Sequence, residues 1–73
     1  MELKEKKVLV IGMGRSGLAA VDLLHRKGAR VTACDINKND KTIEKTREFV
    51  QKGIEVLLGD YPLVTRKRFD LLV

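Results

Sequence analysis

Three glycines at fixed spacing constrain the fold of this chain more than any other feature. The apolar residues "VLVI" run directly into Gly12, Gly14 and Gly17, and a helix-like sequence follows at once. A G-x-G-x-x-G pattern between a buried strand and a helix is typical of a βαβ unit that binds a nucleotide. In such a unit Gly12 permits the tight turn, Gly14 lets a diphosphate approach the main chain, and Gly17 lets the helix pack closely. We therefore expect a strand, a phosphate-binding loop and a helix in that order.

The rest of the chain alternates between strand-like and helix-like segments. Four short runs rich in apolar or β-branched residues read as strands: 7–11, 29–35, 54–60 and 69–73. Two longer segments have helical spacing, 16–27 and 40–52, and residues 61–68 read as a turn or a single helical turn. Alternating strands and helices form parallel sheets through right-handed crossovers. The expected fold class is α/β, a Rossmann-like parallel sheet with strand order 3-2-1-4 and flanking helices.

Both expected helices carry recognisable ends and apolar sides. The first has an apolar stripe made by Leu18, Val21 and Leu24, with Ala20 and Leu23 beside it. The second is expected to begin with Asp40 as its N-cap and to direct four residues toward one side, Ile43, Thr46, Phe49 and Val50. Gly28 and Gly53 stand where a glycine just past a helix C-terminus is expected.

Length limits the chain to one small domain. A chain of 73 residues buries only about 60% of the surface that its unfolded form exposes, so its stability is expected to be marginal. The last expected strand has neither a following helix nor a second partner, which leaves an uncovered sheet edge. We expect residues 1–73 to be a nucleotide-binding domain that belongs to a longer protein and is truncated at its C-terminal end.

Composition argues against several other classes of protein. The net charge of +5 comes from 15 basic and 10 acidic residues, but the basic residues are scattered and only three residues are aromatic, which argues against nucleic-acid binding. The chain has neither an apolar run of membrane-spanning length nor a signal-peptide cleavage site, which favours a cytoplasmic protein. Cys34 lies inside an expected strand without metal-ligand spacing and reads as a small buried apolar residue, and His25 reads as solvated.

Polar residues beside the glycines complete the candidate site. Arg15 and Ser16 stand where a helix N-terminus faces a ligand. Ser16 either caps the helix or donates to a phosphate, and Arg15 either reaches the anion or projects into solvent. Asp35 ends the next strand, where an acid commonly faces a ribose or a base.

Two further residues end the third expected strand, Gly59 and Asp60. They either touch the nucleotide or only form the turn.

The motif in its surroundings resembles a known family. "GMGRSGLAA" followed by "GARVTACD" is similar to the amino-terminal segment of the D-glutamate-adding Mur ligases, and the resemblance covers essentially the whole chain. It implies a domain that holds the UDP part of UDP-N-acetylmuramoyl-L-alanine, in an enzyme of peptidoglycan synthesis and hence of cell shape and division. The loop Gly14–Gly17 would lie against the diphosphate, and Asp35, Ile36 and Asn37 would meet the uracil. Some members carry threonine and arginine after the aspartate, so side-chain contacts with the uracil are not expected from Ile36 and Asn37, whereas backbone contacts at Ile36 are still compatible with the resemblance.

The resemblance also implies what other domains of such a ligase supply. Those domains bind ATP, magnesium and D-glutamate, and ATP phosphorylates the alanyl carboxylate before the amine of D-glutamate attacks it. This chain has no P-loop sequence and no metal-ligand cluster, so we expect it to hold no metal, no cofactor and no catalytic residue, and to be inactive alone.

Two alternatives remain. A nicotinamide-dinucleotide domain, of a dehydrogenase or of the regulatory (TrkA-N-like) type on potassium-transport proteins, also carries this loop, and "LLGDYP" fits it. Asp35 would then hold the adenine ribose. A structural or interaction module would bind no nucleotide at all.

Overall fold

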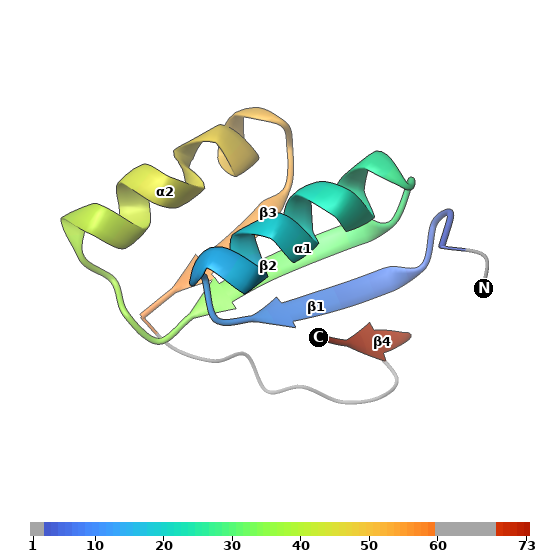
Figure 1. The fold of residues 1–73 in the computed structure, drawn as a ribbon, viewed down its shortest axis with the longest axis horizontal. Helices are drawn as coiled ribbons and strands as arrows, with labels where there is room; N and C mark the ends of the chain where they lie inside the picture. Colours follow the sequence, from blue (N-terminus) through green and yellow to red (C-terminus); the bar gives the residue numbers. More distant parts are fainter. Residues whose placement is uncertain (1–2, 60–68) are drawn as a thin grey trace.

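The computed structural model describes residues 3–59 and 69–73 as a four-stranded sheet with two helices (Figure 1). The elements are β1 (Lys7–Ile11), α1 (Arg15–Arg26), β2 (Arg30–Asp35), α2 (Asp40–Gln51), β3 (Glu55–Leu58) and β4 (Leu71–Leu72). The strand order is β3-β2-β1-β4 and every pair is parallel, which confirms the predicted fold class and order. The segment 61–68, predicted as a turn, lies outside the described residues.

The strands differ in how firmly they are paired. β2 is central and aligns five residues with β1 and four with β3. β4 aligns only Leu71 and Leu72 with β1, although Val73 extends the contact through backbone hydrogen bonds to Leu9 and Ile11. β3 is shorter than predicted and begins at Glu55. The sheet therefore has a well-paired centre and a short outer strand.

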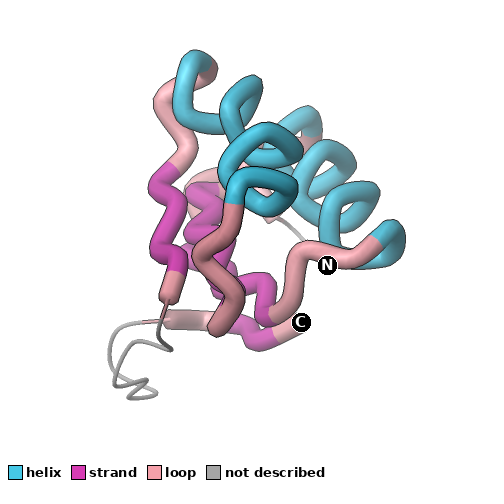
Figure 2. The backbone as a smooth tube through the Cα atoms, turned by 90° about the vertical axis from the view of Figure 1, so that its left-hand side faces the viewer, coloured by secondary structure: helices cyan, strands magenta, loops and turns pink. Residues whose placement is uncertain are grey.

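Both helices cover the same face of the sheet, as the side view shows (Figure 2). The larger apolar core lies between sheet and helices and includes Val8, Val10, Val21, Ala33 and Phe49. A smaller cluster made by Leu9, Cys34 and Phe69 lies on the opposite face, because successive side chains of a strand alternate between faces. Among the described residues, no helix is long and apolar enough to cross a membrane.

Helix α1 follows its predicted apolar stripe. Val21 and Leu24 are buried and Leu18 is half-buried, whereas Leu23 is exposed at the side of the stripe. Gly28 has φ +88° and Gly53 has φ +83°, so each glycine takes the left-handed conformation just past a helix end, as predicted.

Helix α2 departs from the prediction in two ways. Its N-cap is Asn39 and not Asp40, because Asn39 Oδ1 accepts the Thr42 N–H at 2.9 Å and Asp40 is already helical. Its buried side is formed by Thr42, Thr46 and Phe49. The prediction that Ile43 and Val50 share this side is wrong: they lie seven residues apart on an adjacent, exposed side of the helix.

Candidate nucleotide-binding site

The glycine loop leaves β1 through a turn that only glycine adopts readily. The Gly12 N–H still donates to the Cys34 carbonyl at 2.8 Å, which continues the ladder between β1 and β2. Gly12 itself has φ +89°, a conformation that a side chain makes costly. The predicted role of Gly12 in the tight turn is confirmed.

Gly17 is required by a close approach of backbone to backbone. A Cβ atom at this position would lie 1.8 Å from the Gly12 carbonyl oxygen, and backbone atoms cannot move aside cheaply. This agrees with the predicted close packing of the helix on the sheet, because the Gly12 oxygen belongs to the residue that directly follows β1. The third glycine of the motif thus fixes the shape of the loop.

Gly14 marks the open side of the loop. It is the N-cap of α1. The space beside its Cα is open, because a Cβ built there would meet no atom within 4 Å. The first helical hydrogen bond runs from Leu18 N–H to the Gly14 carbonyl at 2.9 Å, so the N–H groups of Arg15, Ser16 and Gly17 precede the helical ladder. No acidic residue lies in this first turn, so the helix end keeps its partial positive charge. An anion fits this position.

The two residues after Gly14 are exposed and helical. Ser16 is the second residue of α1, so the alternative in which it caps the helix is wrong. Its hydroxyl is left at the exposed helix end, as is the side chain of Arg15.

Asp35 joins the two loops that border this helix end. Its Oδ2 accepts the Met13 N–H at 2.8 Å, from the glycine loop, and its Oδ1 accepts the Asn37 N–H at 2.9 Å, from the loop after β2. These hydrogen bonds, from Asn37 and then from Met13, lower the pKa of the Asp35 carboxyl, so it is ionised at neutral pH. Each carboxylate oxygen has a second lone pair, which leaves acceptor capacity for a ligand N–H or hydroxyl.

Ile36 and Asn37 lie beside this carboxylate and are exposed. The backbone N–H of Asn37 is already bonded to Asp35, so a ligand meets the side chains or the remaining backbone groups here.

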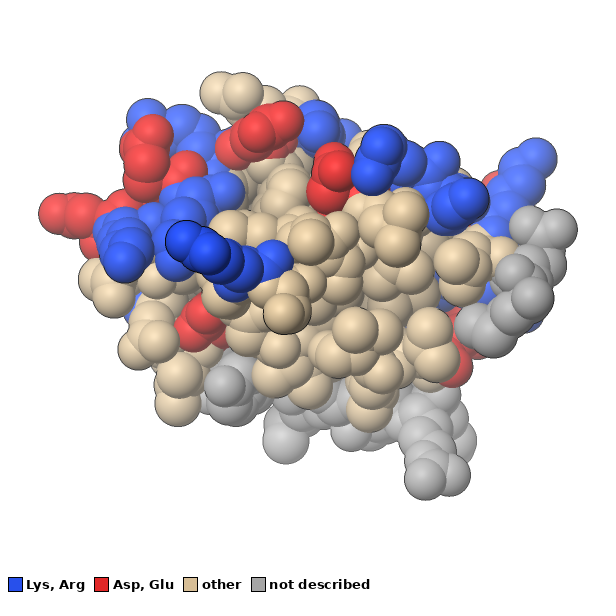
Figure 3. All heavy atoms as spheres, viewed as in Figure 1, with Lys and Arg blue, Asp and Glu red and all other residues tan. Residues whose placement is uncertain are grey.

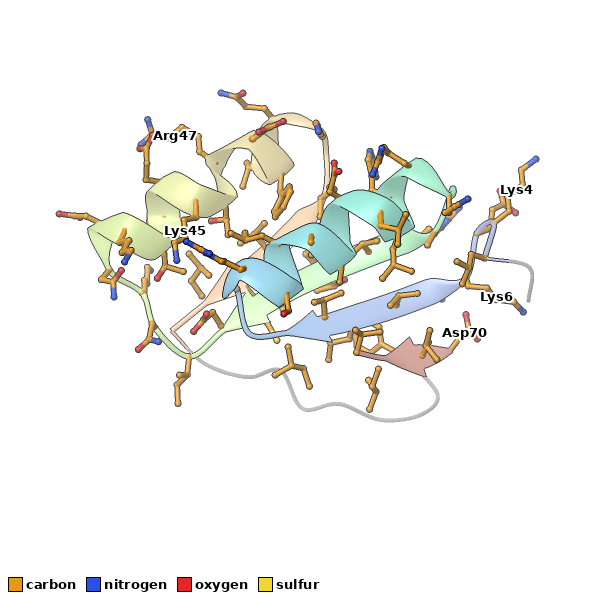
Figure 4. The ribbon with its side chains drawn as sticks, in the orientation of Figure 1. Lys4, Lys6, Lys45, Arg47 and Asp70 are labelled. Carbon is orange, nitrogen blue, oxygen red and sulfur yellow. The ribbon has the colours of Figure 1, made fainter. Side chains whose placement is uncertain are left out.

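Two lysines near Asp35 were missed in the sequence. Lys45 is close enough for its charge to contribute to the low pKa of Asp35, and it lies between α2 and the first turn of α1 (Figure 4). Lys38 lies beside Gly59, since its side-chain carbons approach to 3.4 Å of a Cβ built at that glycine. Lys45 directly precedes the buried Thr46 on α2, so it lies next to the buried side of this helix. The helical spacing of the sequence could have indicated this position of Lys45.

Four other residues singled out in the sequence are Gly59, Asp60, Cys34 and His25. Gly59 has φ +92° and donates its N–H to the Asp35 carbonyl at 2.9 Å, which explains it as a turn residue, while Asp60 lies outside the described residues. Cys34 is fully buried, and burial raises the pKa of its thiol, as suits the predicted apolar role. His25 is half-buried in the last turn of α1, at the opposite end from the glycine loop.

Charge over the visible face is mixed. Lys and Arg side chains are interspersed with Asp and Glu over the helical side, so the net charge does not form one continuous basic field there (Figure 3). Within the described ranges no group of His, Cys, Asp and Glu is placed to hold a metal ion.

Comparison with known proteins agrees with this geometry. Residues 6–73 match the family described as "Mur ligase MurD-like, N-terminal domain". Proteins named UDP-N-acetylmuramoylalanine–D-glutamate ligase are 47% identical in Acidobacterium capsulatum and 43% identical in Pelotomaculum thermopropionicum, over 100% and 99% of this chain. In Ligilactobacillus salivarius the identity is 43% over 93% of the chain. The chain spans only 15–16% of the length of these ligases of peptidoglycan synthesis.

Proposed function

Because the chain belongs to the family of Mur ligase MurD-like N-terminal domains, we propose that it binds the UDP part of UDP-N-acetylmuramoyl-L-alanine. In this proposal the chain is the substrate-anchoring part of a cytoplasmic ligase that adds D-glutamate to that substrate. ATP, bound with magnesium elsewhere in the whole protein, supplies the phosphoryl group that activates the alanyl carboxylate. The residues described here bind and orient the substrate, and they take no part in the transfer of the phosphoryl group.

One observation carries the proposal: an open helix N-terminus beside an ionised carboxylate, both at the carboxyl edge of a parallel sheet. The diphosphate is placed at the free N–H groups of Arg15, Ser16 and Gly17, where Gly14 leaves room. The uracil is placed at Asp35, Ile36 and Asn37, where the Asp35 carboxylate can accept the N–H of the base. A pyrophosphate at the first helix and a base beyond the second strand follow the general rule for open α/β sheets.

The test compares UDP with NAD by amide chemical shifts of the labelled chain. We expect UDP to shift the amides of Gly12–Leu18 and Asp35–Asn37, with affinity on the order of millimolar, about 4 kcal/mol. In Gly14→Val the branched side chain occupies the diphosphate position, so the loop shifts are lost. A larger response to NAD than to UDP in both groups would assign the site to a nicotinamide dinucleotide.

A matched pair on α2 tests the phosphate position separately. Lys45→Gln removes a charge beside the loop, whereas Arg47→Gln removes one from the outer side of α2, where Arg47 pairs with Glu44 at 3.3 Å (Figure 4). We expect Lys45→Gln to weaken UDP binding several-fold and to leave uridine binding unchanged, because uridine lacks the phosphates. Equal effects of the two substitutions would show that only net charge matters.

The isolated chain is expected to show no ligase turnover. With ATP, D-glutamate and UDP-N-acetylmuramoyl-L-alanine present, phosphate release should stay at the level of a blank without protein. Release above the blank would contradict the assignment of catalysis to the rest of the protein.

A further inference from the structure

A groove of about 550 Å³ lies at the amino-terminal edge of the sheet, opposite the glycine loop. Its lining comes from the first residues of three strands and from the end of α1, and includes Lys7, His25, Arg30, Glu55 and Phe69. β1 separates this edge from the loop by its own length, about 13 Å. The groove is thus a different site from the one that Asp35 and Gly14 border.

Two cations, Lys7 and Arg30, line this groove, and neither forms an ion pair with any of the described residues. Lys7 and Arg30 are register partners on neighbouring parallel strands, so their side chains leave the sheet on the same face. Among residues 3–59 and 69–73, no carboxylate forms an ion pair with either side chain. The two positive charges repel each other across neighbouring strands, and an anion between or beside them would relieve this repulsion.

The carboxylates nearby are already engaged. Glu55 Oε1 accepts the Thr32 hydroxyl at 3.1 Å, and this hydrogen bond crosses from β2 to β3 on the same face. Asp70 Oδ2 accepts the backbone N–H of Lys7 at 2.8 Å, and Asp70 lies at this end of the sheet with Lys6 (Figure 4). Both carboxylates hold strands together and keep their negative charge, but neither forms an ion pair with the ammonium of Lys7 or the guanidinium of Arg30.

The remaining lining residues are mainly apolar, with the half-buried His25 and the buried Thr32 as the polar ones. Ala29, Val31, Ile54 and Phe69 contribute to the walls, and all four are buried. A volume of about 550 Å³ lies within the range of small-molecule sites and is too small for the surface of a second protein.

We propose that the groove at the amino-terminal edge of the sheet binds a small organic anion. Its carboxylate or phosphate group lies between Lys7 and Arg30, and its apolar or aromatic body lies against Phe69 and Ile54. The proposal does not depend on the nucleotide assigned to the glycine loop.

Amide chemical shifts of the labelled chain test this site with benzoate, phenyl phosphate and uncharged benzyl alcohol at constant ionic strength. Benzoate and phenyl phosphate are expected to shift Arg30, Thr32, Gly53, Ile54 and Phe69 saturably, and benzyl alcohol is not. Arg30→Gln is expected to weaken benzoate binding about tenfold, as the loss of one charge-assisted hydrogen bond does. Lys7→Gln provides a second variant in case Arg30→Gln unfolds the chain.

Arg26→Gln is the matched control, because Arg26 pairs with Asp22 at 3.3 Å on the exposed end of α1 and does not line the groove. It is expected to leave benzoate binding unchanged. An equal loss in Arg26→Gln, equal shifts with benzyl alcohol, or benzoate shifts confined to Gly12–Leu18 would each overturn the proposal. So would the absence of a saturable shift in the wild-type chain.

Discussion

The three glycines of the loop are present for different physical reasons. Gly12 is needed for its backbone conformation, at φ +89°. Gly17 is needed because the Gly12 carbonyl lies where a Cβ would be. Gly14 meets neither requirement, since the space beside it is open. The motif that looks uniform in sequence therefore combines two structural positions with one that is left for a ligand.

Alanine at Gly17 and at Gly14 should separate these requirements. In an ordinary helix, alanine in place of glycine stabilises by roughly 0.5–1 kcal/mol. At Gly17 the contact with the Gly12 oxygen reverses the sign, and we expect a loss of about 1–3 kcal/mol. Gly14→Ala should cost only about 0.5 kcal/mol, the difference between the two residues at an N-cap. Urea denaturation measures the free energy of unfolding of both variants. Equal losses would contradict the different roles assigned to Gly14 and Gly17.

The carboxylate of Asp35 should make stability depend on pH in a defined direction. Its pKa is lowered in the folded chain by the N–H groups of Asn37 and Met13, so the stabilisation is present above its unfolded pKa, about 3.9. This stabilisation is lost as pH falls through the lower folded value. Asp35→Asn places an amide NH₂ against one backbone N–H, and we expect a loss of about 1–2 kcal/mol at pH 7.

The comparison of wild type and Asp35→Asn is made by denaturant unfolding at pH 7 and at pH 3. The difference between the two chains should shrink at pH 3, because this pH lies below the ordinary pKa of the carboxyl and the unfolded wild-type chain binds the proton there. A difference that stays constant across this range would show that the two hydrogen bonds do not depend on the charge of Asp35.

At the level of elements, the start of α2 depends on one asparagine. Asn39 Oδ1 accepts both the N–H and the hydroxyl of Thr42, at 2.9 and 3.0 Å. Asn39→Ala should destabilise the chain by about 1 kcal/mol, the usual cost of a lost N-cap. Asp40→Ala removes only the attraction of a first-turn carboxylate to the helix dipole, roughly 0.3–1 kcal/mol. Thermal unfolding compares the stability of the two variants. A larger loss of stability in Asp40→Ala than in Asn39→Ala would identify Asp40 as the N-cap.

The helix α2 also shows where prediction from sequence ends. The sequence pattern was sufficient for all six elements, because the strands are short apolar or β-branched runs and the helices carry apolar residues at helical spacing. It was insufficient for the N-cap, since Asn39 and Asp40 are both good caps and only the backbone conformation decides between them. It also placed Ile43 and Val50 on one side of the helix with Thr46 and Phe49, although in the structure both are exposed.

The candidate site, like helix α2, was predictable from the sequence only in part. The glycine spacing identified the loop, and strand order brought Asp35 to it. The bonds of Asp35 to two backbone N–H groups could not be predicted, because they depend on where the loops after β1 and β2 turn. The proximity of Lys45 likewise depends on how α2 packs beside α1.

At the scale of the whole molecule, stability is uneven across the sheet. β2 is paired on both sides and packs against α1, and α1 and α2 are tied by Lys52, whose Nζ lies 3.8 Å from Asp22 Oδ1. β4 aligns two residues with β1, and Leu72 and Val73 are half exposed. Regions with few buried contacts open at lower free energy than the core. The β4 side is therefore expected to open first.

Adjacent amides of Ile11 and Gly12 provide a matched test of this expectation. The Ile11 N–H donates to Val73 on the β4 side and the Gly12 N–H donates to Cys34 on the β2 side, each at 2.8 Å. Bond length does not distinguish them, so any difference in hydrogen-exchange protection reports which strand separates. If β4 detaches locally, the protection factor of Ile11 should be at least about tenfold lower than that of Gly12, a difference of about 1.4 kcal/mol in opening free energy. Val73, whose N–H donates to Leu9 at 2.8 Å, should exchange with Ile11. Equal protection of Ile11, Gly12 and Val73 would instead mean that the four strands open together as one cooperative unit.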